Sequence, residues 1–234
     1  MPKMRFAAIV VVVSVLAGCT VSNVATQGFS AIPAEARLVL MPPDIKYYRI
    51  TASGITEPQS EWTDTARASF DAAFQAFTAD SDLPFELLDR SDMSDLAVDY
   101  DKLHSAVGST ILANHYGITK LPSKRQGETN EYDFDWSLGP GVAELTPQGG
   151  DYALFVFFRD YEAGGGRVGM AIFAAALGVG IYTGHQGGFA SLVDLRSGDV
   201  VWFNNVPVAQ GDMRKPDGAR RLVDQLFDGL TGEG

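Results

Sequence analysis

The sequence predicts an α/β (α+β) fold, a single mixed β-sheet of about five strands with helices packed on it. Segments of strand and helix character follow one another as strand, helix, strand, helix, strand, strand, strand, helix. Residues 152–158 (YALFVFF) are continuously apolar, as expected of a central strand covered on both faces. The turn sequence RSGD at 196–199 separates two apolar runs and predicts an antiparallel hairpin. Such an order favours one sheet in one domain.

The first half of the domain predicts a strand, a loop and a helix. Residues 37–41 (RLVLM) form a short apolar strand that ends at two prolines, and residues 44–61 form a polar loop or irregular hairpin. Residues 62–77 form a helix, capped by Ser60 or Thr63. Its apolar side chains recur at steps of three and four residues: Trp62, Ala66, Phe70, Ala73, Phe74 and Phe77.

The middle of the chain predicts a second strand and a second helix. Residues 85–88 form the strand, and the acidic stretch after it, with Asp89, Asp92 and Asp95, is a solvated loop without the glycine and terminal glutamate of a calcium site. Residues 103–116 form the helix, which Gly117 terminates. A weaker pattern predicts a short helix near 138–145.

The last third predicts the hairpin and a closing helix. Residues 189–195 and 200–206 are the two hairpin strands, and residues 219–230 form the helix. The apolar stripe of that helix comprises Leu222, Val223, Leu226, Phe227 and Leu230.

Composition limits the function. In 234 residues, 46% are hydrophobic, which is enough for a core and argues against general disorder. The formal net charge of −11 makes nucleic acid an unsuitable partner, because an acidic surface repels phosphate. The single cysteine, Cys19, excludes an internal disulfide and a multi-thiolate metal site.

The amino terminus has the layout of a secretory signal. Lys3 and Arg5 precede an apolar stretch at 6–16, which is too short to span a bilayer permanently. The sequence Leu16-Ala17-Gly18-Cys19 then resembles the bacterial lipobox. The resemblance implies that the Cys19 thiol receives a diacylglyceryl group, that cleavage falls between Gly18 and Cys19, and that the new amino terminus is acylated. An ordinary signal peptide with a chance cysteine is the alternative.

The lipobox implies a division of the chain and an address. Residues 1–18 are the lipoprotein signal peptide, 19–36 the lipidated cysteine with a flexible tether, and 37–234 a periplasmic α/β domain. Thr20 stands where an aspartate would indicate inner-membrane retention, so the sorting pattern of enteric bacteria implies the periplasmic face of the outer membrane. Residues 20–34 show no helical or strand period, and fifteen extended residues reach about 50 Å.

The predicted domain resembles small periplasmic domains of envelope lipoproteins. The order of elements and the segment FASLVDLRSGDVVWFN at 189–204 are similar to the curli-secretion lipoprotein and to the amino-terminal domain of TolB. The resemblance implies a non-enzymatic role in envelope assembly or transport. The implied partners are the membrane, reached through the lipid anchor, envelope proteins, and a second copy of the chain.

The segment GGGRVG at 164–169 matches the glycine spacing of a dinucleotide fingerprint. Its first glycine does not directly follow the strand, and the acid that follows, Asp194, lies in a hairpin rather than at the tip of a parallel strand. We therefore expect a flexible glycine loop, and no cofactor. A nucleotide-binding enzyme is the least favoured function.

Residues 168–182 (VGMAIFAAALGVGIY) carry no charge. As a helix they would extend about 22 Å, short of the ~30 Å hydrocarbon core. We expect a buried helix or hairpin, with an oligomer contact or a membrane contact as alternatives. In the alternative, the contact residues are Met170, Ile172, Phe173, Leu177 and Ile181.

No catalytic residue or metal site is predicted. His104 and His115 share a helix face, but eleven residues separate them by about 16 Å. Tyr47, Tyr48 and the three tryptophans are expected to pack rather than to bind a ligand. The leading hypothesis is therefore a lipid-anchored accessory or adaptor of the envelope, and the alternative is an oligomeric transport component that uses 168–182.

Overall fold

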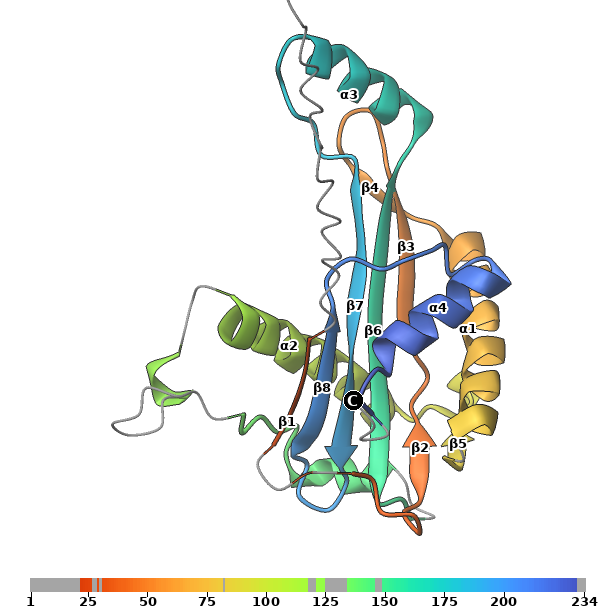
Figure 1. Cartoon of the computed structure of the whole chain (residues 1–234), viewed down its shortest axis with the longest axis vertical. Coiled ribbons are helices and arrows are strands. Elements are labelled where there is room, and N and C mark those ends of the chain that lie inside the picture. The colour runs from red at the N-terminus through yellow and green to blue at the C-terminus, as the bar shows by residue number, and fades with distance from the viewer. Residues whose placement is uncertain are drawn as a thin grey trace, which may run out of the picture.

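A mixed sheet lies at the centre of the molecule, which confirms the predicted fold class (Figure 1). The structure is a computed structural model, and it describes residues 22–26, 29, 31–81, 83–117, 121–124, 134–145 and 149–230. Across these residues the sheet has eight strands, three more than predicted. Cys19 and the predicted signal peptide lie outside the described residues.

The longest strand, β6 (Tyr152–Ala163), organises the sheet. It pairs antiparallel with β7 (Gly184–Asp194), and parallel with β2 (Leu38–Leu40) and β3 (Asp44–Ile50). β7 pairs in turn with β8 (Val200–Val206), so the predicted hairpin is confirmed. β6 is buried over its first half, as its apolar sequence predicted, and it continues five residues further than predicted.

Three short strands complete the sheet. β4 (Thr56–Pro58) pairs antiparallel with β3, so the irregular hairpin predicted over 44–61 is present. β5 (Phe85–Leu87) pairs parallel with β2 at one edge. β1 (Ser22–Ala25) pairs antiparallel with β8. It lies in the segment expected to be a flexible tether, where no strand was predicted.

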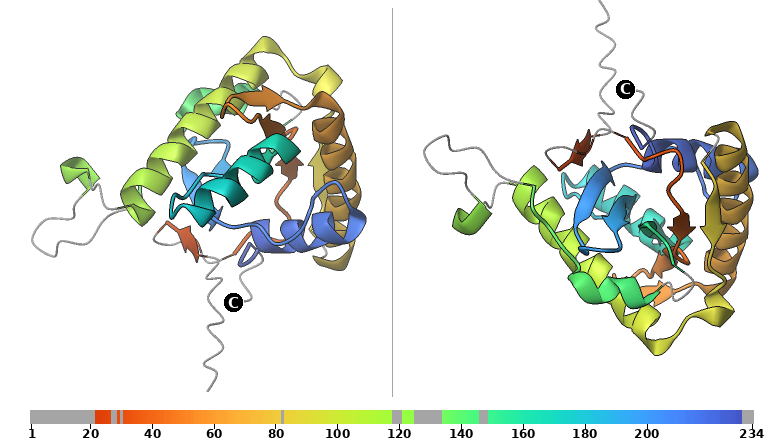
Figure 2. Two further views of the ribbon diagram at one scale, coloured as in Figure 1. Left: turned by 90° about the horizontal axis from the view of Figure 1, so that it is seen from above. Right: turned by 90° about the horizontal axis from the view of Figure 1, so that it is seen from below.

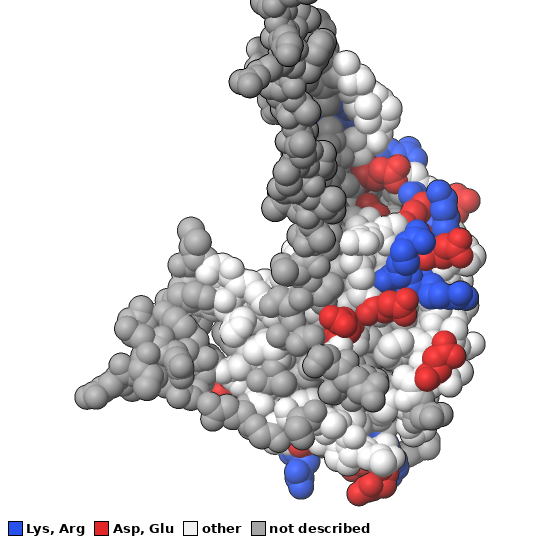
Figure 3. Space-filling model, in the orientation of Figure 1, with Lys and Arg blue, Asp and Glu red and all other residues white. Residues whose placement is uncertain are grey.

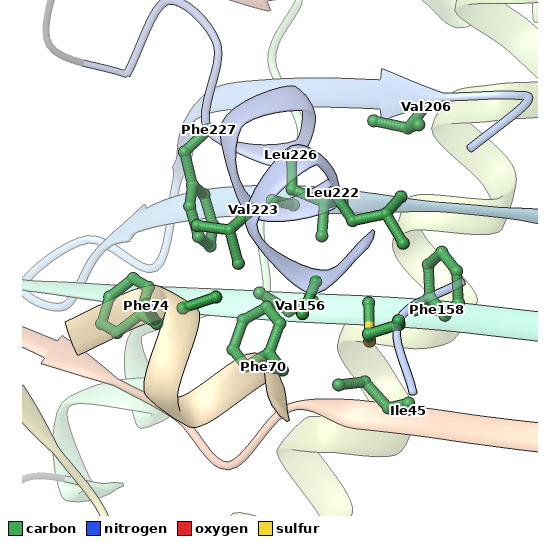
Figure 4. Packing of buried hydrophobic residues seen from close by; sticks show 14 of the residues in the cluster. Ile45, Phe70, Phe74, Val156, Phe158, Val206, Leu222, Val223, Leu226 and Phe227 are labelled. Atoms are coloured by element: carbon green, nitrogen blue, oxygen red, sulfur yellow. The ribbon is translucent and has the colours of Figure 1, made fainter. Parts of the chain in front are cut away.

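One face of the sheet is covered by α1 (Ser60–Ser81) and α4 (Pro216–Leu226) (Figure 2). The apolar stripes predicted for both helices meet in a core of aromatic and aliphatic side chains (Figure 4). Phe74 of α1 lies 5.3 Å from Phe227, centroid to centroid, and both side chains are buried. The amphipathic sequence therefore determines which side of each helix faces the sheet.

The opposite face is covered by α2 (Asp95–Ile111), a π-helical turn (Leu112–Tyr116) and a 3₁₀ helix (Pro140–Leu145). α2 begins eight residues earlier than predicted. Ser94 caps it, since its hydroxyl oxygen accepts a hydrogen bond from the Ala97 amide at 3.2 Å. Two shorter 3₁₀ helices span Arg90–Asp92 and Pro122–Lys124.

The connection between β6 and β7 contains α3 (Gly165–Ala176), which lies beyond the rest of the sheet (Figure 1). The flexible glycine loop predicted at 164–169 is wrong, because Gly164 is the N-cap of this helix and the following residues form its first turns. Within the described part of the chain, no helix is long and apolar enough to cross a membrane.

Candidate functional site

Residues 165–182, which we call the tip, form the most exposed apolar region of the described structure. The tip comprises α3 and the segment that returns to β7. Ile172, Phe173 and Leu177 are 68%, 69% and 67% exposed. Other exposed apolar side chains of the tip are Val168, Met170, Val179 and Tyr182. Figure 3 shows this end of the molecule largely without charge, whereas acidic and basic side chains gather below it.

One face of the helix of the tip, formed by an arginine and two alanines, is partly covered. Arg167, Ala171 and Ala174 are half-buried, and their spacing of four and three residues places them on one face of α3. Ile172 and Phe173 lie outside that face and project into solvent. Because no other element covers them, the apolar side of α3 has no partner within the described residues.

Hydrogen bonds lie both within the tip and at its junction with the sheet. The Arg167 guanidinium donates through Nε to the Tyr182 carbonyl at 3.0 Å, which joins the start of α3 to the returning segment. The Gly164 amide donates to the Ile50 carbonyl of β3 at 2.9 Å. The β3–β4 turn also lies under the helix, since a Cβ on Gly166 would stand 3.3 Å from that of Ala52. These contacts position α3, and with it the exposed side chains, relative to the sheet.

The structure corrects the expectation that residues 168–182 are buried. The physical reason is position: β6 and β7 carry the tip past the layers formed by α1, α2 and α4, so none of these described helices covers it (Figure 1). Of the five predicted contact residues, Met170, Ile172, Phe173 and Leu177 are exposed and Ile181 is half-buried. Gly18 and Cys19 lie outside the described residues, so the predicted lipidation site stays a prediction.

Several tip residues were not singled out from the sequence. Val168, Val179 and Tyr182 belong to the same exposed surface, and Ile55 in the β3–β4 turn is also exposed. The absence of charge across 168–182 was the only available signal, and it marks the whole segment rather than individual side chains.

A buried ion pair lies on β3 and β6, away from the tip. Arg159 donates hydrogen bonds to the carboxylate and the backbone carbonyl of Asp44, and Lys46 lies 3.0 Å from the same carboxylate. Burial alone would raise the pKa of Asp44, but the hydrogen bonds and charges of Arg159 and Lys46 hold it below its ordinary value. This arrangement satisfies buried polar groups and has a structural role.

A second polar cluster joins the loop before α4 to the sheet. Arg214 contacts Asp212 at 2.8 Å and Glu162 at 2.9 Å, and its guanidinium lies over the Trp62 ring at 4.7 Å. Burial raises the pKa of the neighbouring Asp160 to about 6. Among the described residues, no group of three or more His, Cys, Asp or Glu side chains is arranged to hold a metal ion.

Most of the histidines and aromatic residues considered as site candidates pack against other side chains of the protein. His104 is buried, and its Nε2 lies 2.9 Å from the Ser191 hydroxyl. His115 lies beside Tyr116, in the π-helical turn rather than in α2 itself. Tyr47 and Trp202 are buried, which confirms that they pack.

No family model matches the sequence, and no curated protein matches it either. Among solved structures, the chain is similar to the PelC dodecamer from Paraburkholderia phytofirmans, with 10% sequence identity and a TM-score of 0.41. The comparison covers 92% of this chain and 99% of that chain. A point variant of the same dodecamer in a second crystal form gives 10% identity, the same coverage and a TM-score of 0.40. At this level of likeness we assign the chain to no family.

Proposed function

We propose that this protein is a lipid-anchored, non-enzymatic accessory protein of the bacterial envelope, which acts in assembly or transport at the periplasmic face of the outer membrane. Two features support the proposal. The lipobox-like sequence ending at Cys19 supplies the anchor, and the exposed tip supplies a surface for contact. The structural observation that carries the proposal is the tip, because its apolar side chains are exposed and available for contact.

The anchor follows from the chemistry of the predicted amino terminus. A cysteine thiolate is the nucleophile that forms a thioether with a diacylglyceryl group, and the small residues Ala17 and Gly18 fit the cleft of a peptidase. Three acyl chains meet the requirement that stable membrane attachment needs more than one chain.

The tip is suited to contact rather than to chemistry. A contiguous exposed apolar surface costs free energy in water, and in soluble proteins such surfaces mark sites of interaction. Ile172 and Phe173 project from a supported helix and carry no group that could transfer a proton or act as a nucleophile. We therefore place the accessory role of the protein in what the tip touches.

Metabolic labelling with radioactive palmitate tests the anchor. We expect the wild-type chain to incorporate label and to fractionate with outer membranes. The variant Cys19→Ser should lose the label and leave the membrane fraction, whereas the matched control Thr20→Ser should keep both. Absence of label from the wild-type chain, together with unchanged fractionation of Cys19→Ser, would contradict the proposed function.

A second candidate function is an oligomeric transport component that self-associates through 168–182. The exposed side chains of Ile172 and Phe173 favour it, because a second copy of the chain could cover them. Acylation would consume the only native thiol, so Ile172→Cys would introduce a single free one. Oxidation of intact envelopes should then give a disulfide-linked dimer for Ile172→Cys and none for Val98→Cys on α2.

A further inference from the structure

We propose that the tip rests in the same bilayer that holds the acyl chains of Cys19, so that the protein is attached to the membrane at two points. This inference rests on the proposed function, because it takes Cys19 as the lipidated residue. Beyond the lipid anchor, it proposes that the tip is a second point of attachment and that the tip contacts lipid.

The pairing of β1 fixes the end of the sheet at which the anchor emerges. Ser22 pairs with Asn205, and Ala25 pairs with Trp202, so β1 runs antiparallel to β8. β8 runs towards the end of the sheet that carries α3, since Val206 pairs with Gly188 of β7. The amino-terminal end of β1 therefore points towards the tip (Figure 1).

The reach of the anchor can be compared with the position of the tip. Asn205 pairs with both Ser22 and Phe189, so Ser22 lies level with Phe189 of β7. Gly184, where the tip joins β7, is five residues further along, or about 17 Å. Cys19 precedes Ser22 by three residues, which span at most about 10 Å. A bilayer that receives the acyl chains therefore lies no farther from the body of the protein than the tip does.

The chemistry of the tip fits the interfacial region of a bilayer. An interfacial helix places its apolar side about 5–10 Å into the boundary between headgroups and acyl chains. Gly184, at the base of the tip, lies about 17 Å beyond the level of Ser22, whereas Cys19 lies at most about 10 Å beyond it. The base of the tip therefore lies about 7 Å or more past Cys19, which is of that order. The twelve residues of α3 extend about 18 Å, too short to cross the bilayer but sufficient to lie in its surface.

The side chains of the tip agree with this placement. No charged residue occurs from Val168 to Tyr182, and the guanidinium of Arg167 is held by the Tyr182 carbonyl rather than presented outward. Tyr182 is exposed at the base of the tip, where an amphipathic ring suits the interface.

The short tether favours lipid over a protein as the occupant. With β1 paired to β8, only two residues separate Cys19 from the folded domain. A folded partner seated on the tip would have to fit between the domain and a bilayer held within about 10 Å of Ser22. Helix diameters with side chains are already about 10–12 Å.

Fluorescence quenching tests the proposal with the full lipidated chain. Ile172→Cys, labelled with an environment-sensitive dye, is reconstituted in phosphatidylcholine vesicles, which avoid electrostatic attraction. Doxyl groups on the lipid chains should reduce the emission of the dye roughly twofold or more, because the side chain lies among them. The matched control Val98→Cys, an exposed apolar position on α2, should show no quenching.

The outcomes separate this inference from the proposed function. Intact mass first establishes whether Cys19 carries acyl chains. An acylated protein whose dye at 172 is not quenched overturns the second contact and leaves the anchor standing. A chain without acyl groups on Cys19 overturns both.

Discussion

At the scale of single residues, His104 shows how this fold accommodates a completely buried polar group. The side chain is 1% exposed, stacks on Phe155 with centroids 4.9 Å apart, and contacts the Ser191 hydroxyl. Burial lowers the pKa of His104 to about 3, because an imidazolium would lose its hydration and the negative charge of Asp44 offsets that loss only in part. The histidine is therefore a neutral part of the core.

The pKa of His104 predicts a pH dependence of stability. Between about pH 6.5 and 3 the unfolded chain binds a proton that the folded chain does not, so the free energy of unfolding falls as the pH falls. From pH 7 to pH 4.5 this contribution amounts to about 2–3 kcal/mol. Urea titrations at the two pH values measure it as the difference between wild type and His104→Gln.

Two carboxyl groups change the free energy of unfolding with pH in the opposite sense, and both are present in the wild type and in His104→Gln. The pKa values of Asp101 and Asp160 are raised to about 6 by burial, so their unfavourable contribution grows as the pH rises through about 4 to 6. If His104→Gln keeps the wild-type dependence, the assignment to His104 is wrong.

The Asp44–Arg159 pair gives a second residue-scale prediction. Asp44→Asn leaves the largely buried guanidinium of Arg159 without its counter-charge, so we expect a loss of about 3 kcal/mol in the free energy of unfolding. The double variant with Arg159→Gln should lose less than the sum of the single variants. Denaturant titration of all four proteins measures the coupling, and strict additivity would contradict an interacting pair.

At the scale of elements, close packing decides where α2 sits. A Cβ added to Gly108 would stand 2.1 Å from the ring of Phe189, which itself stacks between Phe157 at 4.7 Å and Phe203 at 5.3 Å. Only glycine allows the helix backbone to approach this aromatic row. Gly169 of α3 is the opposite case, since no atom lies within 4 Å of an added Cβ.

The same substitution should therefore have opposite effects in the two helices. Gly108→Ala should destabilise the protein by about 1–3 kcal/mol, because overpacking outweighs the gain in helix propensity. Gly169→Ala should be neutral or stabilising by up to about 1 kcal/mol. Thermal and urea unfolding of both variants test the prediction, and equal shifts of the same sign would count against it.

The sequence predicts well those elements whose pattern is local. The stripe that includes Phe70 and Phe74 predicts α1, and the continuous apolar run predicts β6. The start of α2 was missed because its first two turns are rich in acidic and polar residues, and its cap, Ser94, lies within an acidic stretch. β1 was missed because its pairing with β8 connects segments about 180 residues apart.

The candidate site was located by sequence, but its exposure was not predictable. An uncharged run such as 168–182 has the same composition whether it is covered or not. Its exposure depends on the length of β6 and β7, which carry it beyond the helices. Cys19 is recognised only from the lipobox-like sequence, and the structure does not describe it.

At the scale of the whole molecule, the face shown in Figure 3 carries acidic and basic side chains on the body below the tip, whereas the visible part of the tip is largely without charge. The whole chain carries a formal net charge of −11, while the uncharged side chains of Ile172, Phe173 and Leu177 are exposed at one end. The end of the sheet that carries the tip is also the end towards which β1 points. In the proposed attachment through Cys19 and the tip, this shared end is the one that faces the bilayer.

Replacing the tip side chains tests this division. In the double variant Ile172→Asn/Phe173→Asn, the free energy of unfolding should change by no more than about 0.5 kcal/mol, because both residues are exposed. Binding of a hydrophobic dye to the folded protein should fall markedly. Ile45→Asn, at a fully buried position, should instead lose several kcal/mol. A tip variant as unstable as Ile45→Asn would show that α3 is part of the core.

The intact mass of the mature protein, purified from native envelopes, tests whether Cys19 is lipidated. We expect a chain that begins at Cys19 and carries a diacylglyceryl group on its sulfur and an acyl chain on its amino group. A chain that retains residues 1–18, or one with an unmodified Cys19 thiol, would contradict it.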